Sequence, residues 1–582
     1  MNRFREGFVE WQERFGGSGV SAGEGLRRAK AAHGVVRADD VRRVAGELGW
    51  PVAAVSGTAS FYADFAGGGQ GRRHVRVCEG TSCFVSTLGR HIDRLEVALG
   101  VGRGDRAPDG SVSLQVVHCL GYCYASPAAL DGRVPRAGPA LDGLLTEATG
   151  GARTTRQGIR SELPDVSDGA PPVPYQNASS RAVLLAGLIG EEGAWEAWPE
   201  ALAAGAERVI AEVGAAGLRG RGGAEFPVTV KWSAAAAGPA PRYVVANGDE
   251  GDPGSFCDRL LMEGDPHRVL EGLALAGFAV GAARGVVLVR SEYPAALARM
   301  RTAVTEARAS GHLGADVHGS GFGFDVEVVE GAGSYVAGEE TALLHLLQGL
   351  RGSARARPPY PTSRGVGGRP TAVNNVETLA AVPWIVRHGG AAYRRLGLPD
   401  EPGTKLVCLS ERFRRPGVYE VEFGVPLRLI VEDLGGGLRE GRTLRAVQIG
   451  GPLGGFLSPA ETHVPLSAGA LAEAGVALGH GSLVAVDTDV PAGELLRHVW
   501  SFAASESCGA CVPCRVGSRR GLELAERIAA APAGQVDAAL ATQERVAQVM
   551  QVGSLCAFGR NVPGSVRSLV RVYRDDLESG AS

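Results

Sequence analysis

The cysteines are the residues whose spacing most clearly indicates chemistry, because eight of the ten gather in two sets. In the first set, Cys78-x4-Cys83 and Cys119-x3-Cys123 each follow a predicted strand. Four thiolates that converge from two strand ends suit a [2Fe–2S] cluster. Zinc is the main alternative, although structural zinc usually shows C-x2-C knuckles, and a pair of disulfides is the other.

The second cysteine set lies near the C-terminal end of the chain. Cys508, Cys511 and Cys514 are spaced C-x2-C-x2-C, and Cys556 follows after an alanine-rich helical stretch. Three closely spaced cysteines with one remote cysteine are typical of a [4Fe–4S] cluster. Zinc is less favoured at this set, because no second pair of cysteines lies nearby.

A glycine-rich loop at residues 217–227, with Lys231 just beyond it, lies between the two cysteine sets. Glycine allows positive φ and lets the backbone approach a ligand closely, and amide, arginine and lysine donors suit a phosphate. The loop begins like a dinucleotide fingerprint, but Glu225 stands where a third glycine would fall. It therefore predicts a nucleotide-type loop and makes an ordinary Rossmann fingerprint a weak interpretation.

The predicted strands 242–246, 286–290 and 324–330 are each followed by a polar loop. Acidic turns are often merely solvated, but open α/β sheets bind ligands beyond the carboxyl ends of their strands. Carboxylates at a helix start can also receive ribose hydroxyls. The carboxylates concerned are Asp249, Glu250, Asp252, Glu339 and Glu340.

Composition limits the class of protein. Sixty basic side chains stand against 63 acidic ones, without a basic block of the kind that binds nucleic acid. The longest apolar run, at residues 272–283, is shorter than the roughly 20 residues of a spanning helix, so we expect a core element and no membrane insertion. Few, clustered cysteines and the absence of an apolar leader indicate a cytoplasmic protein.

Periodicity and turn residues predict a multidomain α/β chain. A helix is expected over 84–99, and Cys257 and Cys408 are expected in the core. The β-rich segment before the last cysteines shows no chemistry of its own. We predict a helical region over 1–70, a [2Fe–2S] domain over 71–148, a linker over 149–180, a nucleotide-binding domain over 181–400, a β-rich domain over 401–490 and a helical [4Fe–4S] domain over 491–582.

These motifs resemble, in order, two subunits of respiratory NADH dehydrogenase. SGTASFY at 56–62 and the first cysteine set resemble the thioredoxin-like [2Fe–2S] subunit of the 24-kDa type. From about residue 185 onward the chain resembles the FMN- and NADH-binding subunit of the 51-kDa type. The resemblance implies a thioredoxin-like domain with a helical lead-in, a Rossmann-like FMN/NADH domain, a β-grasp-like (SLBB) spacer and a helical [4Fe–4S] bundle.

The resemblance also implies residue roles. Residues implied to hold FMN are Gly220, Gly222, Lys231, Asn247, Asp249, Glu339, Asn374, Asn375 and Thr378. Those implied to receive NADH are Gly223, Phe226, Tyr335, Glu340, Arg357 and Tyr360. Glu250 and Gly338 belong to the same cofactor-binding motifs.

Departures from the family pattern fall around the nicotinamide. Glu225 replaces a glycine, Asp252 replaces a glutamate, and Arg357 and Tyr360 replace Lys and Phe. Glu340 and Asp252 are expected to shape the nucleotide site and its potential. Glu225 is expected to narrow the pocket or to tune the preferred direction of hydride transfer.

The implied cofactors point to one activity. Nicotinamide exchanges a hydride, iron–sulfur clusters pass single electrons, and a flavin can do both. Fusion of the two subunits resembles the diaphorase subunit of soluble NAD-dependent formate dehydrogenases, with NAD-reducing hydrogenase and NADH:quinone oxidoreductase as alternatives. The partner would be a large catalytic subunit with further iron–sulfur clusters and either molybdenum or tungsten, or nickel–iron. A non-catalytic iron–sulfur scaffold is the alternative of another class.

The two cysteine sets give the first test. Cys514→Ala should leave flavin reduction by NADH intact and stop electron transfer to the partner, because the [4Fe–4S] cluster is the expected exit. Cys78→Ala should affect that transfer less. Ferricyanide and partner-coupled rates measure the two steps, and a larger coupled loss at Cys78 would reverse the expected path.

Overall fold

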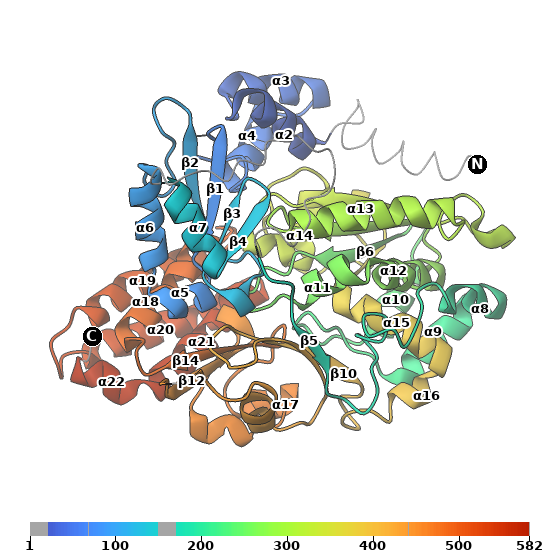
Figure 1. Ribbon diagram of the computed structural model, residues 1–582. Coiled ribbons are helices and arrows are strands. Elements are labelled where there is room, and N and C mark those ends of the chain that lie inside the picture. The colour runs from blue at the N-terminus through green and yellow to red at the C-terminus, as the bar shows by residue number, and fades with distance from the viewer. Residues whose placement is uncertain (1–20, 68, 149–169, 440, 581–582) are drawn as a thin grey trace.

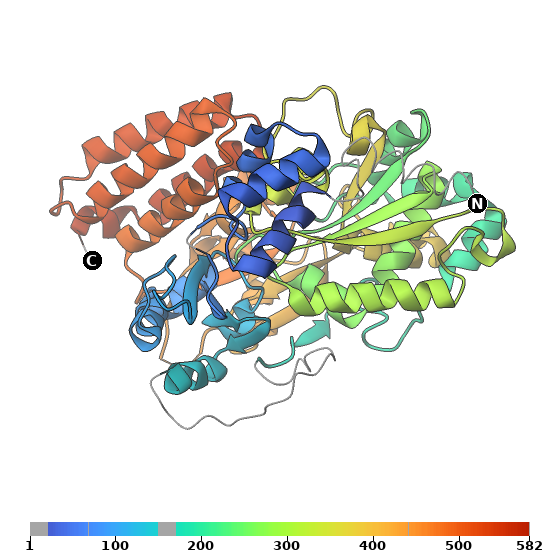
Figure 2. The same ribbon diagram turned by 90° about the horizontal axis from the view of Figure 1, so that it is seen from above.

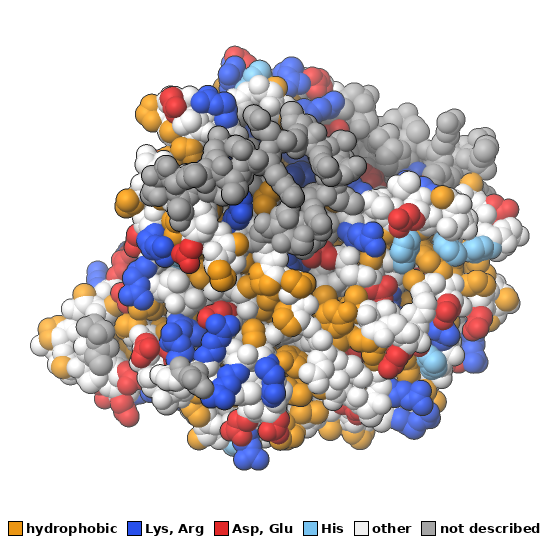
Figure 3. Space-filling view, in the orientation of Figure 1, with side chains coloured by type: hydrophobic (Ala, Val, Ile, Leu, Met, Phe, Trp, Pro, Cys, Tyr) orange, Lys and Arg blue, Asp and Glu red, His pale blue; other side chains and the backbone are white. Residues whose placement is uncertain are grey.

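The computed structural model describes residues 21–67, 69–148, 170–439 and 441–580. Residues 1–20 of the predicted helical region and 149–169 of the predicted linker lie outside them. Figure 1 shows a parallel α/β unit, a smaller sheet beside it, a second β unit below and a helical C-terminal part. Within the described ranges, no helix combines the length and the apolar character needed to cross a bilayer. Figure 3 shows acidic and basic side chains interspersed over one face.

Helices α2 (Ala22–His33), α3 (Ala38–Leu48) and α4 (Val52–Phe61) precede the first sheet. Ser21 caps α2 by accepting the Glu24 amide, and α2 ends at Gly34, which is left-handed at φ 71°. The apolar faces of the three helices pack into one core cluster through Leu26, Val44 and Val55.

The first sheet has the strand order β2-β1-β3-β4. Its strands β1 and β2 are parallel, and the other pairs are antiparallel. The expected single helix over 84–99 is wrong, because Leu88 and Gly89 adopt left-handed φ values of 54° and 80° that break it in two. The elements are β1 (Arg73–Cys78), α5 (Thr81–Thr87), α6 (Arg90–Leu99), β2 (Val112–Val117), η1 (Cys123–Ala125), β3 (Ala128–Asp131), β4 (Val134–Ala137) and α7 (Pro139–Ala148).

The central sheet is fully parallel, with the order β8-β7-β6-β9. Alternate residues of β6 enter different cores, because successive side chains of a strand point to opposite faces. Val244 packs with the cluster that contains α12 and α15, and Val245 packs with α14 and the N-terminal helices. The strands are β6 (Tyr243–Gly248), β7 (Arg284–Val289), β8 (Asp325–Glu330) and β9 (Thr371–Asn375).

Helices surround this sheet and connect its strands. The longest apolar run of the sequence forms most of α12, which is buried as expected. The helices are α8 (Ala197–Ala204), α9 (Ala206–Ala216), α10 (Val228–Ala236), α11 (Cys257–Gly264), α12 (Pro266–Val280), α13 (Pro294–Ala309), η3 (Val317–Gly319), η4 (Tyr335–Gly338), α14 (Glu340–Leu347), η5 (Val366–Gly368), α15 (Val376–His388) and α16 (Gly390–Tyr393).

A six-stranded sheet has the order β13-β12-β14-β10-β11-β5. Strand β5 (Tyr175–Asn177) lies inside the predicted linker and pairs in parallel with β11, so the chain enters this sheet before it forms the central unit. Three residues are too short for a periodic signal. The other elements are β10 (Thr404–Leu409), β11 (Gly417–Glu422), η6 (Leu429–Leu434), β12 (Leu444–Ile449), η7 (Gly451–Leu453), β13 (Gly455–Leu457), η8 (Pro459–His463), α17 (Ala468–Glu473) and β14 (Ser482–Asp487).

The C-terminal part is a bundle, and Figure 2 shows its red helices side by side. Close contacts depend on glycine: a Cβ on Gly521 would lie 2.2 Å from the Trp500 ring, and one on Gly517 2.4 Å from Met550. The helices are α18 (Ala492–Glu506), α19 (Val512–Ala529), α20 (Asp537–Gly553), α21 (Ala557–Val572) and α22 (Arg574–Ser579). Phe84 of the smaller sheet unit stacks on His498 at 4.2 Å, which joins that unit to the bundle.

The packing of α12 on α15 predicts a mutational effect. A Cβ on Gly272 would lie 2.0 Å from the Leu379 carbonyl oxygen, so the helices must separate in Gly272→Ala. We expect a loss of ~1–3 kcal/mol in the free energy of unfolding. Gly46→Ala is the matched control, because its Cβ would meet nothing within 4 Å and should stabilise α3 by about 0.4–1 kcal/mol. Thermal unfolding measures both, and equal midpoints would contradict the packing argument.

Candidate functional site

The first cysteine set lies around the carboxyl ends of β1 and β2. Cys78 ends β1, Cys83 lies in α5, Cys119 follows β2, and Cys123 begins η1; all four side chains are buried. The Cys119 and Cys123 sulfurs are 4.0 Å apart. The Gly80 amide donates to Cys78 Sγ at 3.3 Å, and the Gly121 amide donates to Cys119 Sγ at 3.4 Å. None of these four cysteines forms a disulfide, and backbone donors of this kind stabilise the thiolates that bind iron.

The loops that carry these cysteines touch the acidic turn at residues 249–254. A Cβ on Gly80 would lie 3.2 Å from Pro253 Cβ, and one on Gly121 would lie 2.7 Å from the Tyr293 ring. The Tyr293 hydroxyl donates to the Glu250 carbonyl at 3.3 Å. The loops of the [2Fe–2S] cysteines are therefore in contact with the acidic turn that follows β6.

In the second cysteine set, Cys508 and Cys511 lie between α18 and α19, Cys514 lies in the first turn of α19, and Cys556 directly precedes α21. Cys508 and Cys514 are buried, whereas Cys511 and Cys556 are half-buried. A Cβ on Gly559 would lie 2.9 Å from Cys514 Cβ, which shows how closely the start of α21 approaches this turn. Burial raises the pKa of Cys514 to about 12, so metal binding must displace its proton.

Tyr335 connects the second cysteine site to the acidic turn. Its hydroxyl donates to Asp252 Oδ1 at 2.5 Å. Its ring lies 5.0 Å from Phe502 and 5.7 Å from Phe558, in the apolar cluster that contains Cys508 and Cys514. One half-buried aromatic side chain therefore spans the space between the acidic turn and the [4Fe–4S] cysteines.

The glycine loop between α9 and α10 folds back on itself. The Gly220 amide donates to the Phe226 carbonyl at 3.0 Å, and Gly223 is left-handed at φ 88°. A Cβ on Gly222 would lie 3.0 Å from Asn375 Cβ. The Arg221 amide donates to Thr378 Oγ1 at 2.8 Å, so the loop is held against β9 and α15.

The residues implied to hold FMN gather around this loop at the carboxyl ends of the central strands. Lys231 Nζ donates to the Val373 carbonyl at 2.8 Å and to Glu340 Oε1 at 3.0 Å. Asn247 Nδ2 donates to the Gly338 carbonyl at 2.9 Å. A Cβ on Gly338 would lie 2.9 Å from an Asp249 carboxylate oxygen, so these two residues are also in contact.

Asn374 tests whether these residues suit a flavin. Its Oδ1 accepts from the Trp232 indole at 3.3 Å, but its buried Nδ2 has no hydrogen-bond partner among the described residues. An unsatisfied buried donor costs about 1–3 kcal/mol. A flavin acceptor atom would remove this cost, so the residues fit FMN.

The residues implied to receive NADH form a more open border. The rings of Phe226 and Tyr360 are 49% and 56% exposed. Arg357 forms an ion pair with Glu339, and its second guanidinium nitrogen lies 3.6 Å from Glu340. Exposed rings and a guanidinium are suited to a base and to phosphates.

Glu225 lies in the glycine loop, beside residues of the six-stranded sheet unit. Its backbone is left-handed at φ 51°, which is strained for a non-glycine residue. It lines a small hollow with Arg219, Glu401 and Lys405, and burial, with Glu401, raises its pKa. The hollow lies between the loop and the six-stranded sheet, and the effect of Glu225 on the nicotinamide stays a prediction.

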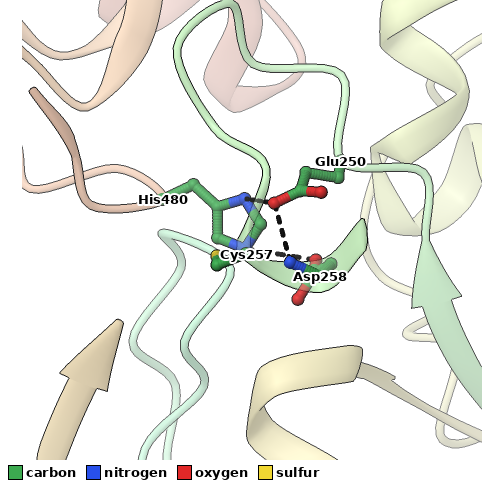
Figure 4. A group of neighbouring side chains, drawn as sticks. All are labelled: Glu250, Cys257, Asp258 and His480. Carbon is green, nitrogen blue, oxygen red and sulfur yellow. Dashed lines mark hydrogen bonds and ion pairs between the residues drawn. The ribbon is translucent and has the colours of Figure 1, made fainter. Parts of the chain in front are cut away.

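One buried cluster has no counterpart among the sequence predictions. Glu250, Cys257, Asp258 and His480 each place one possible ligand atom within 4.8 Å of the others. Figure 4 shows the four side chains facing one another. Asp258 lies in the first turn of α11, just after the acidic turn, a position that could have drawn attention. His480 stands alone between two glycines in the segment expected to lack chemistry, and nothing nearby in the sequence indicates its partners.

The buried carboxyl of Asp249 should make the stability of the protein depend on pH. Burial raises the pKa of its carboxyl from 3.8 to about 8, so the folded state keeps a proton that the unfolded state releases. Its contribution to stability is therefore present below pH 3.8 and is lost as the pH rises towards 8. Asp249→Asn should stabilise the cofactor-free protein at pH 8 and have little effect at pH 4.

The control for Asp249 is Asp39→Asn, which changes an exposed carboxylate on α3. Thermal unfolding midpoints at both pH values measure the effect. An Asp249→Asn gain that is the same at pH 4 and pH 8 would contradict a protonated buried carboxyl.

The models of three protein families match the chain over segments that contain these sites. They are the thioredoxin-like [2Fe–2S] ferredoxin over residues 22–133, the Nuo51 FMN-binding domain over 213–384 and the NADH-ubiquinone oxidoreductase-F iron–sulfur binding region over 494–580. The matches confirm the predicted fold class and cofactors: FMN, NAD, a [2Fe–2S] and a [4Fe–4S] cluster.

Similar proteins cover most of the chain. The HndC subunit of the NADP-reducing hydrogenase of Solidesulfovibrio fructosivorans is 39% identical over 64% of this chain and 75% of its own length. The NADH-quinone oxidoreductase F subunit of Escherichia coli is 38% identical over 64% and 84%.

A crystal structure of NAD⁺-reducing [NiFe]-hydrogenase in the H2-reduced state matches 96% of this chain and 93% of its own, with a TM-score of 0.84 and 30% identity. The chain therefore belongs to the family of NADH-quinone oxidoreductase F subunits, which are FMN- and iron–sulfur-dependent NADH oxidoreductases, and it carries a thioredoxin-like [2Fe–2S] ferredoxin domain in the same polypeptide.

Proposed function

We propose that the chain is the diaphorase subunit of a cytoplasmic complex, passing electrons between NAD(H) and a partner catalytic subunit. The position of the acidic turn carries the proposal. Tyr335 joins the turn to the [4Fe–4S] cysteines, and Gly80 and Tyr293 join it to the [2Fe–2S] cysteines. The flavin cradle thus stands between two one-electron sites.

FMN supplies, when bound, the exchange between a two-electron hydride and single electrons. The chain's own residues bind and orient the flavin and the dinucleotide. Lys231 and the glycine-loop amides suit the flavin phosphate, and the exposed rings of Phe226 and Tyr360 suit the bases of the dinucleotide. Arg357 pairs with Glu339 and Glu340, so a dinucleotide phosphate would compete with these carboxylates for the guanidinium.

For the terminal substrate we propose formate, oxidised by a molybdenum- or tungsten-containing partner subunit. The fusion of a thioredoxin-like [2Fe–2S] domain to the flavin unit in one chain supports this proposal. An NAD-reducing [NiFe]-hydrogenase is a second candidate, favoured by the structural match over 96% of the chain.

Isolation of the native complex tests both the diaphorase activity and the terminal substrate. Bound FMN and NADH:ferricyanide activity are expected, and the loss of both would overturn the diaphorase in favour of a non-catalytic scaffold. The metal of the co-purifying large subunit decides the substrate: molybdenum or tungsten supports formate, and nickel supports H2.

We further propose that electrons leave through an exposed apolar patch over the half-buried Cys511 and Cys556. Valines on α19 and α20 expose 48% to 81% of their surfaces, and contact between Pro513 and Gly553 brings these two helix ends together. The patch consists of Val512, Val516, Val549, Val552 and Leu555.

The surroundings of the patch indicate its occupant. Exposed Arg515 and Arg519 share a helical face with Val512 and Val516, since residues three and four apart are neighbours on a helix. A fitting occupant is an iron–sulfur subunit with an apolar contact surface rimmed by carboxylates. Apolar patches of this kind are typical of protein interfaces.

Val552→Glu tests the patch, because it places a charge where 81% of the side chain is exposed. Partner-coupled NADH oxidation should fall at least about tenfold, the equivalent of ~1.4 kcal/mol of binding, while NADH:ferricyanide activity is kept. Val97→Glu is the matched control, at 83% exposure on α6. Equal coupled rates in both variants would place the docking surface elsewhere.

A further inference from the structure

His480 belongs to a buried polar network, and Figure 4 shows it beside Glu250, Cys257 and Asp258. It lies on the turn before β14 and is 4% exposed. Its Nε2 lies 3.2 Å from Asp258 Oδ2, and its Nδ1 lies 3.9 Å from Glu250 Oε1. One imidazole therefore stands between two buried carboxylates from the turn and helix that follow β6.

The charges around the imidazole decide its state. Burial works against protonation of His480, but the Asp258 carboxylate outweighs it, so the pKa rises to about 10. Lys405 also faces the cluster, and its ammonium pairs with Glu377. Cys257 lies beside Glu377, with its Sγ 3.7 Å from the carboxylate. Among the described residues, the cation that lies against the Glu250 and Asp258 carboxylates is accordingly the His480 imidazolium.

Asp258 transmits the position of His480 to the flavin cradle. Asn375 Nδ2 donates to the same Asp258 oxygen at 2.6 Å and lies 3.2 Å from His480 Nε2, and Asn375 Oδ1 accepts from the Thr378 amide at 3.2 Å. Asn375 also lies against Gly222 of the glycine loop. Loss of the His480 charge would therefore leave the Asp258 carboxylate without its counter-charge. This carboxylate orients Asn375, which is implied to hold FMN.

Glu250 gives His480 a second connection. Its backbone is strained at φ 24°, and its carbonyl accepts from Arg290 Nη1 at 2.8 Å. Its carboxylate accepts the amides of Asp258 and Arg259, both at 2.8 Å, at the start of α11. The network thus fixes both the acidic turn and Asn375.

We propose that His480 is a positioning residue for FMN: clamped as an imidazolium between Asp258 and Glu250, it orients Asn375 and the acidic turn. The proposal rests on the flavin site described above. It assigns to the β-grasp-like unit a part in cofactor binding, where the sequence indicates only a spacer.

A metal ion is the competing occupant, because the four side chains could supply ligands. The carboxylate oxygens, however, already accept well-formed hydrogen bonds. Glu250 takes two amides, and Asp258 takes the Glu377 amide at 3.0 Å besides Asn375. The imidazolium supplies the positive charge that a metal would bring.

The test compares His480→Gln with His463→Gln, an exposed histidine of the same unit, in the full chain. FMN is removed and titrated back by the quenching of its fluorescence. His480→Gln should raise the Kd for FMN at least about tenfold, or ~1.4 kcal/mol, and change the visible circular dichroism of the bound flavin. The iron content of both variants should stay as in the wild type. The Kd of His463→Gln for FMN should also stay unchanged.

The double variant Asp258→Asn/His480→Gln separates positioning from folding, because it removes the unpaired buried charge. Its thermal midpoint should recover while its FMN Kd stays high. An FMN Kd within twofold of wild type in His480→Gln, or a Kd that recovers together with the midpoint, would overturn the proposal. One equivalent of zinc in the wild type, lost in His480→Gln, would replace it by a metal site. Failure of the wild type to bind FMN would instead overturn the flavin site itself.

Discussion

The structure depends on the accommodation of buried charge where its parts meet. Asp249, Glu250 and Asp258 are all less than 9% exposed, and isolated carboxylates cannot remain ionised in such surroundings. Burial raises the pKa of Asp249, and Arg290 and His480 provide compensation from neighbouring elements. Arg290 follows β7 of the central sheet and His480 comes from the six-stranded sheet, so neither partner is local to the acidic turn. The turn can therefore take its shape only when the separate units have assembled.

This constraint explains why the redox sites are close without sharing ligands. The [2Fe–2S] cysteines reach the turn through Gly80 and Gly121, where a side chain would collide with Pro253 or Tyr293. The [4Fe–4S] cysteines reach it through the Tyr335 ring and hydroxyl. The turn thus gives the flavin cradle one wall that borders both clusters. Buried, hydrogen-bonded charge in that wall resists rearrangement, which suits a site whose geometry must persist through electron transfer.

The β-grasp-like unit contacts the flavin cradle, although its sequence indicated only a spacer. Its longer strands are buried almost throughout, and β5 joins them from before the nucleotide-binding unit. Its turns nevertheless enter the site: a Cβ on Gly223 would lie 3.1 Å from Gly479, and one on Gly451 would lie 3.2 Å from Asp252. Such close approaches require glycine on both sides or a short partner, and they lock the unit onto the cradle. A unit held this closely can transmit packing changes to the flavin.

The sequence by itself indicated the two cysteine sets and the glycine loop, and it determined the division into α/β, β and helical parts. Their signals are local, because cluster ligands and phosphate loops lie within a few residues of one strand or helix end. It could not determine that Leu88 splits a helix, that β5 completes a distant sheet, or that Glu225 faces Glu401. Above all it could not connect His480 with Asp258 and Asn375, because these residues are far apart along the chain. Only the tertiary structure decided those relations, since burial and charge pairing depend on which surfaces meet and not on the order of residues.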